Sequence, residues 1–257
     1  MMHFLRKIRQ VIHIWLKAFA FFCFGLGSLV IALHFLPLLR FFIHPAERFR
    51  RIIRNIIRTA FRTFVMLMKV LRLITVKVEN YNILQEVEGM LICANHPSLI
   101  DVVILISLVP NADCIIKSKL WNNPIVRGIV RILYIPNSLD VEETINACRR
   151  TLEEGNNLII FPEGTRTAEG QTRFQRSAAQ IALRTGYNIL PIRIIADSPI
   201  GLRKGDSLFC APESGIVNYN LEVHKPLYTG HYIHEPVSIA SRSLTNDLKL
   251  AIIPVKV

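Results

Sequence analysis

The sequence predicts an α/β fold, with a mixed, mostly parallel sheet covered by helices and preceded by an N-terminal membrane-associated helical segment. From about residue 73 onward, short runs of Val, Ile and Leu alternate with helical patterns, as in sheets that are covered on both faces. Before that point, two long helical patterns concentrate the hydrophobic residues, which make up 51% of the 257-residue chain. A chain of this length has room for one domain with a complete core and a small additional segment.

The first apolar pattern runs from Ala18 to Leu39 without a single Asp, Glu, Lys or Arg. As a helix it would be ~33 Å long, which matches the hydrocarbon layer of a membrane. A cleavable signal peptide has an apolar region of only ~7–15 residues and a small-residue cleavage site, so we expect this segment to be retained. His34 and Pro37 within the segment, and Lys17 and Arg40 beside it, leave two arrangements open. The helix either spans the bilayer or lies in a single leaflet.

A second helical pattern, residues 46–72, is amphipathic and strongly basic. Its apolar residues recur at steps of three and four and are Phe49, Ile52, Ile53, Ile56, Ile57, Ala60, Phe61 and Phe64. The opposite side carries Arg48, Arg51, Arg54, Arg58 and Arg62. A solvated face normally mixes in acids, so the pattern favours contact with anionic lipid over a solvated arginine face on a helix packed against the domain. We expect residues 1–72 to be membrane-associated helices.

Residues 73–257 are expected to form one domain, because no internal repeat or low-complexity linker interrupts them. The expected strands are Ile74–Val78, Met90–Ala94, Cys114–Lys117, Ile132–Ile135, Leu158–Phe161, Ile189–Ile195 and Asn218–Val223. The expected helices are Leu99–Leu108, Pro124–Ile132, Val141–Glu154, Phe174–Thr185 and Ile239–Ile252. Asp140 and Glu143 form a capping box at the start of the third of these helices, and Gly186 ends the fourth.

The net charge is +12, from 31 Lys and Arg against 19 Asp and Glu. A surface of this sign attracts anionic lipid headgroups, nucleic acid or an acidic carrier protein, and charge alone does not choose among them. Arg and Lys are more numerous after the apolar segment than before it, which favours a cytoplasmic position for the domain. The five cysteines lack a Cys-x-x-Cys pair, and several lie in apolar runs, which indicates reduced thiols.

Residues that can carry chemistry follow the expected strand that ends at Ala94. His96 lies at the carboxyl end of that strand, where open α/β sheets gather their ligands, and Asp101 lies one turn into the next helix. A carboxylate that accepts the proton of one ring nitrogen leaves the other nitrogen free to act as a base. Ser98-x-x-Asp101 is also a capping box, so this motif taken alone keeps a purely structural reading open.

A second cluster, Phe161-Pro162-Glu163-Gly164-Thr165-Arg166, follows another buried strand. A tight turn there presents Glu163 and Arg166, and a guanidinium group is well shaped to grip phosphate. Taken alone, this loop also fits a surface turn with an ion pair. The two clusters in this order, on a basic chain with a membrane-associated segment, together indicate acyl transfer.

The two clusters resemble motifs of the lysophosphatidate acyltransferase superfamily of glycerolipid acyltransferases. The likeness covers roughly residues 90–195. Asn95-His96-x-x-x-x-Asp101 and Phe161 to Arg166 match the first and third blocks of the family, and Leu190-Pro191-Ile192 is similar to its fourth. The resemblance implies that residues 73–257 are an acyltransferase domain.

The resemblance also implies roles for individual residues. His96 would be the catalytic base, and Asp101 would orient its ring. The site for the acceptor's phosphate would comprise Lys117, Glu163, Gly164, Thr165 and Arg166. Lys117 is included because the family usually carries a lysine at this place.

The second block departs from the family pattern. Its usual Ile-Asp-Arg-like triplet contributes an arginine to phosphate binding, but here the segment ends Tyr134-Ile135-Pro136-Asn137-Ser138. Lys119 stands where the family often has Glu, and Ser177 replaces a common Gly. The missing arginine weakens the expectation of lysophosphatidate as acceptor more than the expectation of acyl transfer.

We therefore expect a membrane-bound O-acyltransferase that moves a fatty acyl group from an acyl thioester, acyl-CoA or acyl-ACP, to the hydroxyl of a lysophospholipid. The acceptor expected first is 1-acyl-sn-glycerol-3-phosphate, which would give phosphatidate. Another lipid acceptor, such as an ornithine lipid, a glycolipid or a specialised lipid, is the alternative that the missing arginine keeps open. A non-catalytic lipid-binding or scaffolding protein is the alternative from another class.

The expected chemistry needs no metal and no cofactor besides the acyl-CoA or acyl-ACP co-substrate. Backbone N–H groups near Ser98 to Ile100, at a helix N-terminus, are expected to support the oxyanion. Membrane lipids and the acyl donor are the expected partners, and nucleic acid is not. The expected location is the inner or cytoplasmic membrane, with the catalytic domain facing the cytoplasm.

Overall fold

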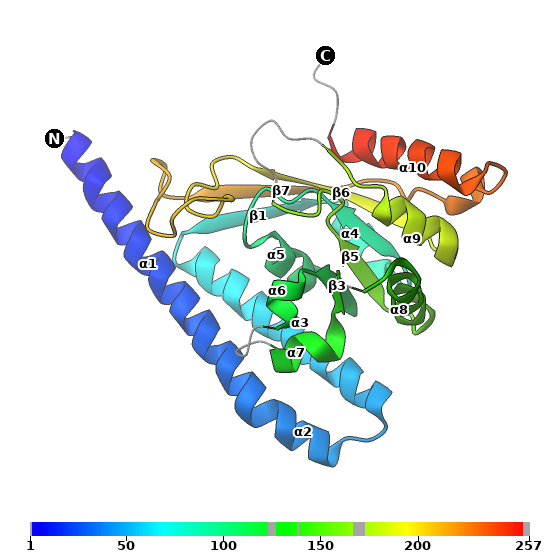
Figure 1. The fold of residues 1–257 in the computed structure, drawn as a ribbon. Helices are drawn as coiled ribbons and strands as arrows, with labels where there is room; N and C mark the ends of the chain where they lie inside the picture. Colours follow the sequence, from blue (N-terminus) through cyan, green and yellow to red (C-terminus); the bar gives the residue numbers. More distant parts are fainter. Residues whose placement is uncertain (1, 123–126, 138, 167–172, 254–257) are drawn as a thin grey trace.

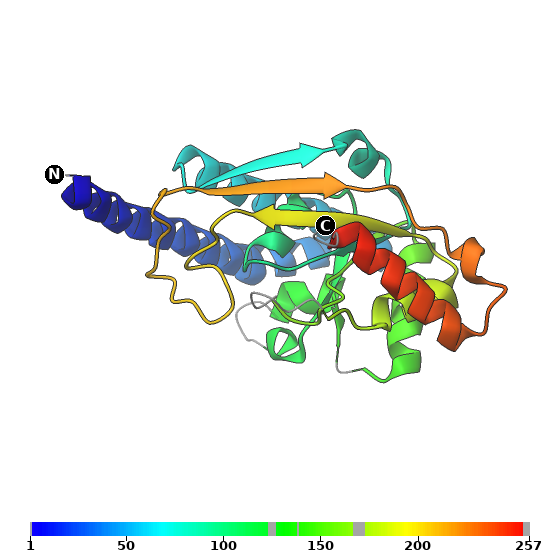
Figure 2. The ribbon, with the colours of Figure 1, turned by 90° about the horizontal axis from the view of Figure 1, so that it is seen from above.

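The computed structural model describes residues 2–122, 127–137, 139–166 and 173–253 (Figures 1 and 2). Within them one sheet is built from β1 (Ile74–Glu79), β2 (Leu91–Ala94), β3 (Ala112–Ile116), β4 (Ile135–Pro136), β5 (Asn157–Ile160), β6 (Ile189–Ala196) and β7 (Val217–Val223). The strand order is β1-β7-β6-β2-β5-β3-β4. Strands β6, β2, β5, β3 and β4 run parallel, whereas β7 is antiparallel to β6 and parallel to β1. This mixed, mostly parallel sheet confirms the predicted fold class.

Helices cover both faces of the sheet (Figure 1). Those on one face are α1 (Met2–Val30), α3 (Ala46–Val70), α5 (Asp101–Leu108) and α7 (Arg127–Leu133). Those on the other face are α8 (Val141–Glu153), α9 (Ser177–Thr185) and α10 (Val237–Ile252). In β2, Ile92 and Ala94 pack towards the first group, and Leu91 and Cys93 pack towards the second. Because both faces are buried, the strand reads as a continuous apolar run rather than an alternating one.

Several observed boundaries of helices and strands differ from the predicted ones. The expected strand Ile132–Ile135 is wrong, because α7 continues to Leu133 and β4 holds only Ile135 and Pro136. Short apolar runs do not distinguish a strand from a buried helical turn, and Ile129, Val130 and Leu133 are buried at helical spacing. Of the helix expected over 124–132, residues 124–126 lie outside the described part.

The two predicted helix ends have the expected geometry. Asp140 accepts a hydrogen bond from the Glu143 N–H at 2.7 Å and so begins α8. Gly186 ends α9 with a φ of +81°, in the left-handed region that favours glycine. Helix α5 begins at Asp101 rather than at Leu99, because the residues after His96 form a turn that serves the site described below.

The N-terminal segment forms one long helix that then turns back along the domain. Helix α1, a π-helical turn (Ile31–Phe35) and α2 (Leu36–Phe42) are continuous, and Lys7–Phe42 is long and apolar enough to cross a membrane. Only 11% of its most apolar window is buried. Helix α3 returns alongside α1 (Figure 1) and packs on α5, with Phe49, Ile53 and Ile57 in the core.

The predicted basic face of α3 needs a correction. Arg54 is only 6% exposed, and its guanidinium donates two hydrogen bonds to the Asp113 carboxylate, at 2.8 and 2.7 Å. Arg58 donates to the Leu108 carbonyl at 3.0 Å. These two arginines therefore face the domain, because a buried carboxylate and an open helix end lie there. The helix is packed against the domain, and the contact of its exposed Arg48, Arg51 and Arg62 with lipid stays a prediction.

The remaining short helices are connectors. Helix α4 (Tyr81–Glu86) joins β1 to β2, and α6 (Ser118–Trp121) follows β3. The loop that joins β6 to β7, residues 197–216, is long and crosses towards α1. It lies beside the N-terminal half of α1 in both views (golden in Figures 1 and 2).

Candidate active site

Three neighbouring strands bring the predicted site residues together. Strands β2, β5 and β3 are adjacent and parallel, so their carboxyl ends meet at one edge of the sheet. His96 follows β2, the loop of residues 161–166 follows β5, and Lys117 follows β3. Segments that lie up to 70 residues apart in the sequence thus form one site, because the sheet order differs from the chain order.

His96 and Asp101 are hydrogen-bonded. The His96 Nδ1 lies 2.8 Å from Asp101 Oδ2, and the Asp101 carboxyl is fully buried. The carboxylate also accepts the Ser98 N–H at 2.6 Å and the Ser98 hydroxyl. With Nδ1 donating to Asp101, Nε2 is the basic nitrogen, and no other described residue hydrogen-bonds it. The His96 side chain is 17% exposed, so a substrate can reach it.

A buried tyrosine extends this chain of hydrogen bonds. The Tyr219 hydroxyl donates to Ser98 Oγ at 2.9 Å, and Tyr219 is 1% exposed. Burial raises the pKa of Tyr219, and the Asp101 charge raises it further, so the phenol stays protonated and donates. Sequence reasoning missed Tyr219 and assigned Ser98 only to a capping box. The carboxylate in fact binds the Ser98 backbone and His96 at the same time, so the structural and catalytic readings are compatible.

Three further contacts hold the His96 loop in place. The Asn95 side chain donates to the Ile194 carbonyl at 2.8 Å and accepts the Ile194 N–H at 2.6 Å, which ties the loop to β6. The His96 N–H donates to Glu163 Oε2 at 3.3 Å. The His96 ring stacks on Phe161, with ring centroids 4.2 Å apart and planes 23° apart. Glu163 therefore joins the first motif to the third.

The loop of residues 161–166 depends on a glycine. Gly164 has a φ of +69°, and its N–H donates to the Phe161 carbonyl at 3.0 Å. A Cβ at this position would collide with the Gln175 side-chain amide. The turn brings Thr165 to Lys117, whose Nζ donates to Thr165 Oγ1 at 3.2 Å. The structure thus places Lys117 beside the third motif.

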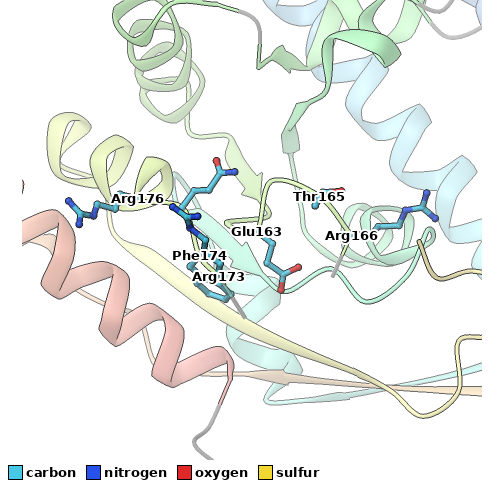
Figure 3. A pocket seen from close by; sticks show the side chains of 7 residues that line it. Glu163, Thr165, Arg166, Arg173, Phe174 and Arg176 are labelled. Atoms are coloured by element: carbon cyan, nitrogen blue, oxygen red, sulfur yellow. The ribbon is translucent and has the colours of Figure 1, made fainter. Parts of the chain in front are cut away.

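Arg166 points away from Glu163. Its Nη1 donates to the carbonyl oxygens of Leu202, at 3.3 Å, and of Arg203, at 3.2 Å. In Figure 3, Arg166 and Arg176 lie on opposite sides of Glu163, and both guanidinium groups are directed away from it. The cavity in this view has a volume of about 930 Å³ and is lined by Glu163, Thr165, Arg166, Arg173, Phe174, Gln175 and Arg176. Three arginines make its lining strongly cationic.

Asn137 stands where the second block of the family usually has an arginine, and it also lies near this site. Strand β4 is the neighbour of β3, and Asn137 follows β4. Asn137 Oδ1 accepts the Ser118 N–H at 3.1 Å and the Ser118 hydroxyl at 3.0 Å, directly after Lys117. The asparagine caps a short helix at the place where an arginine would add a cation.

Two of the backbone N–H groups expected to support the oxyanion have other partners. The Ser98 N–H donates to Asp101 and the Leu99 N–H donates to the Leu202 carbonyl at 2.9 Å, so these two groups do not support an oxyanion as expected. Cys93 is fully buried, and burial raises the pKa of its thiol, so it is not a reactive nucleophile. In the part of the chain that the structure describes, no group of three or more His, Cys, Asp and Glu is placed to hold a metal ion.

Comparison with known proteins agrees with this geometry. Residues 75–195 match the family model described as Acyltransferase, and this range includes His96, Asp101, Lys117 and Arg166. The comparisons thus support an acyltransferase domain that is similar to the lysophosphatidate acyltransferase superfamily. The family's first and third motifs are thus the two loops that meet at the carboxyl ends of β2 and β5.

Individual relatives in this family are moderately similar. A chloroplastic 1-acyl-sn-glycerol-3-phosphate acyltransferase of Brassica napus is 26% identical over 144 residues, which are 52% of this chain and 40% of the relative. A 1-acyl-sn-glycerol-3-phosphate acyltransferase of Helicobacter pylori is 30% identical over 114 residues, 41% of this chain and 48% of that one. The matched region therefore spans less than half the length of these relatives.

A solved structure matches over nearly the whole chain. The 1-acyl-sn-glycerophosphate acyltransferase PlsC of Thermotoga maritima superposes with a TM-score of 0.67 and 20% identity. The match covers 95% of this chain and 96% of that structure. At this identity the likeness shows the shared fold, including the N-terminal helices.

Proposed function

We propose that this protein transfers an acyl group from an acyl thioester to the free hydroxyl of 1-acyl-sn-glycerol-3-phosphate, giving phosphatidate. The observation that carries the proposal is the His96–Asp101 pair, because its carboxylate is fully buried and is held by three donors. Lipid binding alone needs no base with a buried, oriented partner. The names of the relatives support the same acceptor class.

The geometry supports a direct transfer with one base. His96 Nε2 takes the proton of the acceptor's hydroxyl while the oxygen attacks the thioester carbonyl, and Asp101 stabilises the imidazolium that forms. The tetrahedral intermediate then breaks the carbon–sulfur bond. The imidazolium returns its proton to the leaving thiolate, so the enzyme ends in its starting state. No metal or redox cofactor enters this proposed sequence.

The cations around the site suit two phosphate-bearing substrates. Lys117 donates to Thr165, and Arg166 follows Thr165 in the same loop, which supports a role for both cations in binding the acceptor's phosphate. Arg173 and Arg176 line the same cavity and are exposed. Acyl-CoA and acyl-ACP both carry phosphate on the pantetheine arm, so this pair supports a donor of either kind.

The test of the proposed acceptor is Arg166→Ala. Loss of a charge-assisted contact in a partly shielded site costs ~1.5–3 kcal/mol, so kcat/KM for lysophosphatidate should fall roughly ten- to a hundredfold. The KM of the acyl donor should change much less. Arg184→Ala is the matched control, because Arg184 pairs with Glu142 on the covering helices, outside the cavity.

Three outcomes of this assay have different meanings. Strong wild-type activity that Arg166→Ala leaves unchanged would refute the phosphate site. Activity on a glycolipid or ornithine lipid with little on lysophosphatidate would favour another acceptor, as the asparagine at position 137 allows. Wild-type protein that binds lipid vesicles but acylates no lysolipid, with either donor, would establish the non-catalytic alternative.

We also propose that the N-terminal helix lies in one leaflet rather than across the bilayer. Contacts with the rest of the protein occur along α1 and at the start of α2. Arg9 binds the β6–β7 loop, and Phe24 packs on Phe64. Leu36 packs on Gly128. A helix held in this way cannot cross a membrane unless the domain enters it. Its uncovered side carries the apolar residues Ile8, Val11, Ile12, Trp15, Phe19, Phe22, Leu26, Leu29, Val30 and Leu33. Such a stripe suits immersion in the interface.

Tryptophan quenching distinguishes the two arrangements. Leu29→Trp, in a background with Trp15 and Trp121 replaced by Phe, reports the depth of the middle of the apolar segment. A helix in one leaflet places this residue roughly 5–10 Å below the headgroup boundary, so shallow brominated lipids should quench it best. Ile8→Trp in the same background is the shallow reference. Strongest quenching of Leu29→Trp by lipids brominated near the bilayer centre would show that the helix spans.

The proposed location is the cytoplasmic face of a membrane. The five cysteines are unpaired, which fits a reducing compartment. Exposed arginines at the start of α3, Arg48 and Arg51, add an electrostatic attraction of about 1 kcal/mol each to anionic lipid. Binding to vesicles should therefore weaken with salt without being lost, because the apolar side of α1 is indifferent to salt.

A further inference from the structure

We propose that the β6–β7 loop, residues 197–216, links the N-terminal helix α1 to Arg166, and that Lys17 and His13 are positioning residues for binding of the acceptor's phosphate. The proposal rests on the proposed function, in which Arg166 contacts that phosphate. It adds that the direction of Arg166 is set by a contact on the membrane-facing helix, outside the family motifs.

One side of α1 holds the loop through three polar side chains. Arg9, His13 and Lys17 are spaced by four residues, so they lie on the same side of the helix. Each binds a carbonyl oxygen of the loop. Arg9 donates to Glu213, His13 Nδ1 lies 2.6 Å from the Gly215 oxygen, and Lys17 donates to Cys210.

The contacts of His13 and Lys17 are buried although the helix is mostly exposed. His13 is 5% exposed and Lys17 is 2% exposed. Burial of an ammonium group is costly unless hydrogen bonds replace those to water, so the loop carbonyl is needed to hold Lys17 there. A lysine in an apolar helix that served only membrane binding would instead extend its amine to the headgroups.

Glycines in the loop allow the close approach. Gly201 and Gly215 have positive φ values, +81° and +72°. A Cβ at Gly201 would collide with Lys17 Nζ and with the Cys210 carbonyl oxygen, and one at Gly215 would press on the Arg9 side chain. The loop is therefore shaped to lie against these particular residues of α1.

The residue after Gly201 in this loop contacts the active site. The Leu202 carbonyl, next to Gly201, accepts both the Leu99 N–H at 2.9 Å and Arg166 Nη1 at 3.3 Å. The Arg203 carbonyl accepts Arg166 Nη1 at 3.2 Å. Asp206 braces the turn, because its carboxylate accepts the Gly201 N–H at 2.7 Å.

These bonds orient Arg166 and leave part of it free for a ligand. A guanidinium has five N–H groups, and only Nη1 binds the loop, so Nε and Nη2 can still bind phosphate. If α1 no longer binds the loop, the Leu202 and Arg203 carbonyl oxygens can move, and the Arg166 guanidinium is no longer held in one orientation. Since α1 also meets the lipid surface, the loop places the phosphate site at a set position relative to the membrane that supplies the acceptor.

The test compares Lys17→Met with Lys7→Met in the full-length protein. Both variants remove one lysine charge from α1, but Lys7 is exposed and Lys17 binds the loop. For Lys17→Met we expect the KM for lysophosphatidate to rise about tenfold, as for a lost charge-assisted bond. The KM for the acyl donor and the pH profile of kcat should stay within twofold, and Lys7→Met should resemble the wild type.

Hydrogen exchange gives a readout that does not need activity. Lys17→Met should speed exchange of the Leu99 and Gly201 amides, which bond to the Leu202 carbonyl and to Asp206, whereas Lys7→Met should not. This result holds even if wild-type protein fails to acylate lysophosphatidate, so failure of the proposed function and failure of this link are distinguishable.

A second variant tests whether the effect of Lys17→Met comes from the loop contact rather than from misfolding. Gly201→Ala disturbs the loop without removing a charge, and it should raise the acceptor's KM as Lys17→Met does. If both changes act through the same contact, the double variant should be no worse than the more severe single one. Unchanged acceptor KM and unchanged Leu99 exchange in Lys17→Met would overturn the proposal. Equal loss for donor and acceptor with a lowered melting temperature would overturn it too.

Discussion

The Asp101→Asn variant separates the catalytic role of this carboxylate from its role at the start of α5. Asp101 is fully buried and accepts hydrogen bonds from His96 Nδ1, the Ser98 N–H and the Ser98 hydroxyl. Asparagine fits the same space but brings one oxygen and one NH₂ group, so at least one donor would face another donor. It also removes the negative charge that stabilises the imidazolium during transfer.

The expected loss follows from these changes. We expect kcat to fall by roughly 10³- to 10⁴-fold, or about 4–5.5 kcal/mol of transition-state stabilisation. Ser98→Ala keeps the charge and removes one bond to a charged group, worth about 1.5–3 kcal/mol, so about a ten- to hundredfold loss is expected. Tyr219→Phe removes a bond between neutral groups, worth about 0.5–1.5 kcal/mol, so its loss should be about tenfold or less.

The assay is transfer of labelled acyl groups from acyl-CoA or acyl-ACP to lysophosphatidate in mixed micelles, with kcat measured at saturating substrates. Thermal melting of each variant is the control for folding. The order of the three effects tests the network more sharply than any single value. A folded Asp101→Asn variant that keeps kcat within tenfold of the wild type would refute the catalytic reading and leave Asp101 a helix cap.

Other consequences of the structure can be measured in parallel. His96→Ala should abolish transfer while vesicle binding persists, and turnover above a few per cent of wild type would contradict its role as base. Arg54→Met should destabilise the fold by about 3–5 kcal/mol in urea unfolding, because Asp113 then stays buried without its partner, whereas the exposed Arg51→Met should change little. Asn137→Arg should raise kcat/KM for lysophosphatidate if a missing cation limits it, and no gain would indicate that the existing cations suffice.

The sequence by itself determined the elements and chemistry that depend on near neighbours. Six of the seven expected strands form within a few residues of their predicted bounds. Buried strands such as β2 and β5 carry continuous apolar runs, whereas β1 and β7 alternate apolar with polar residues. His96 and Asp101 are five residues apart, so their contact follows from one local turn. The loop of residues 161–166 was predictable as a turn for a similar reason, since Gly164 adopts a positive φ.

Tertiary structure decided what depends on distant partners. Arg54 was predicted on a lipid-facing side, but Asp113, 59 residues away, turns it inward. Tyr219 reaches Ser98 across 121 residues, and no local pattern marks a tyrosine on the buried side of an alternating strand as part of a hydrogen-bond network. The bond from Lys17 to Cys210 spans 193 residues, and that from Arg166 to Leu202 spans 36. Periodicity and motif spacing describe only a residue's own segment, whereas the order of strands in the sheet and the path of the β6–β7 loop decide which segments meet.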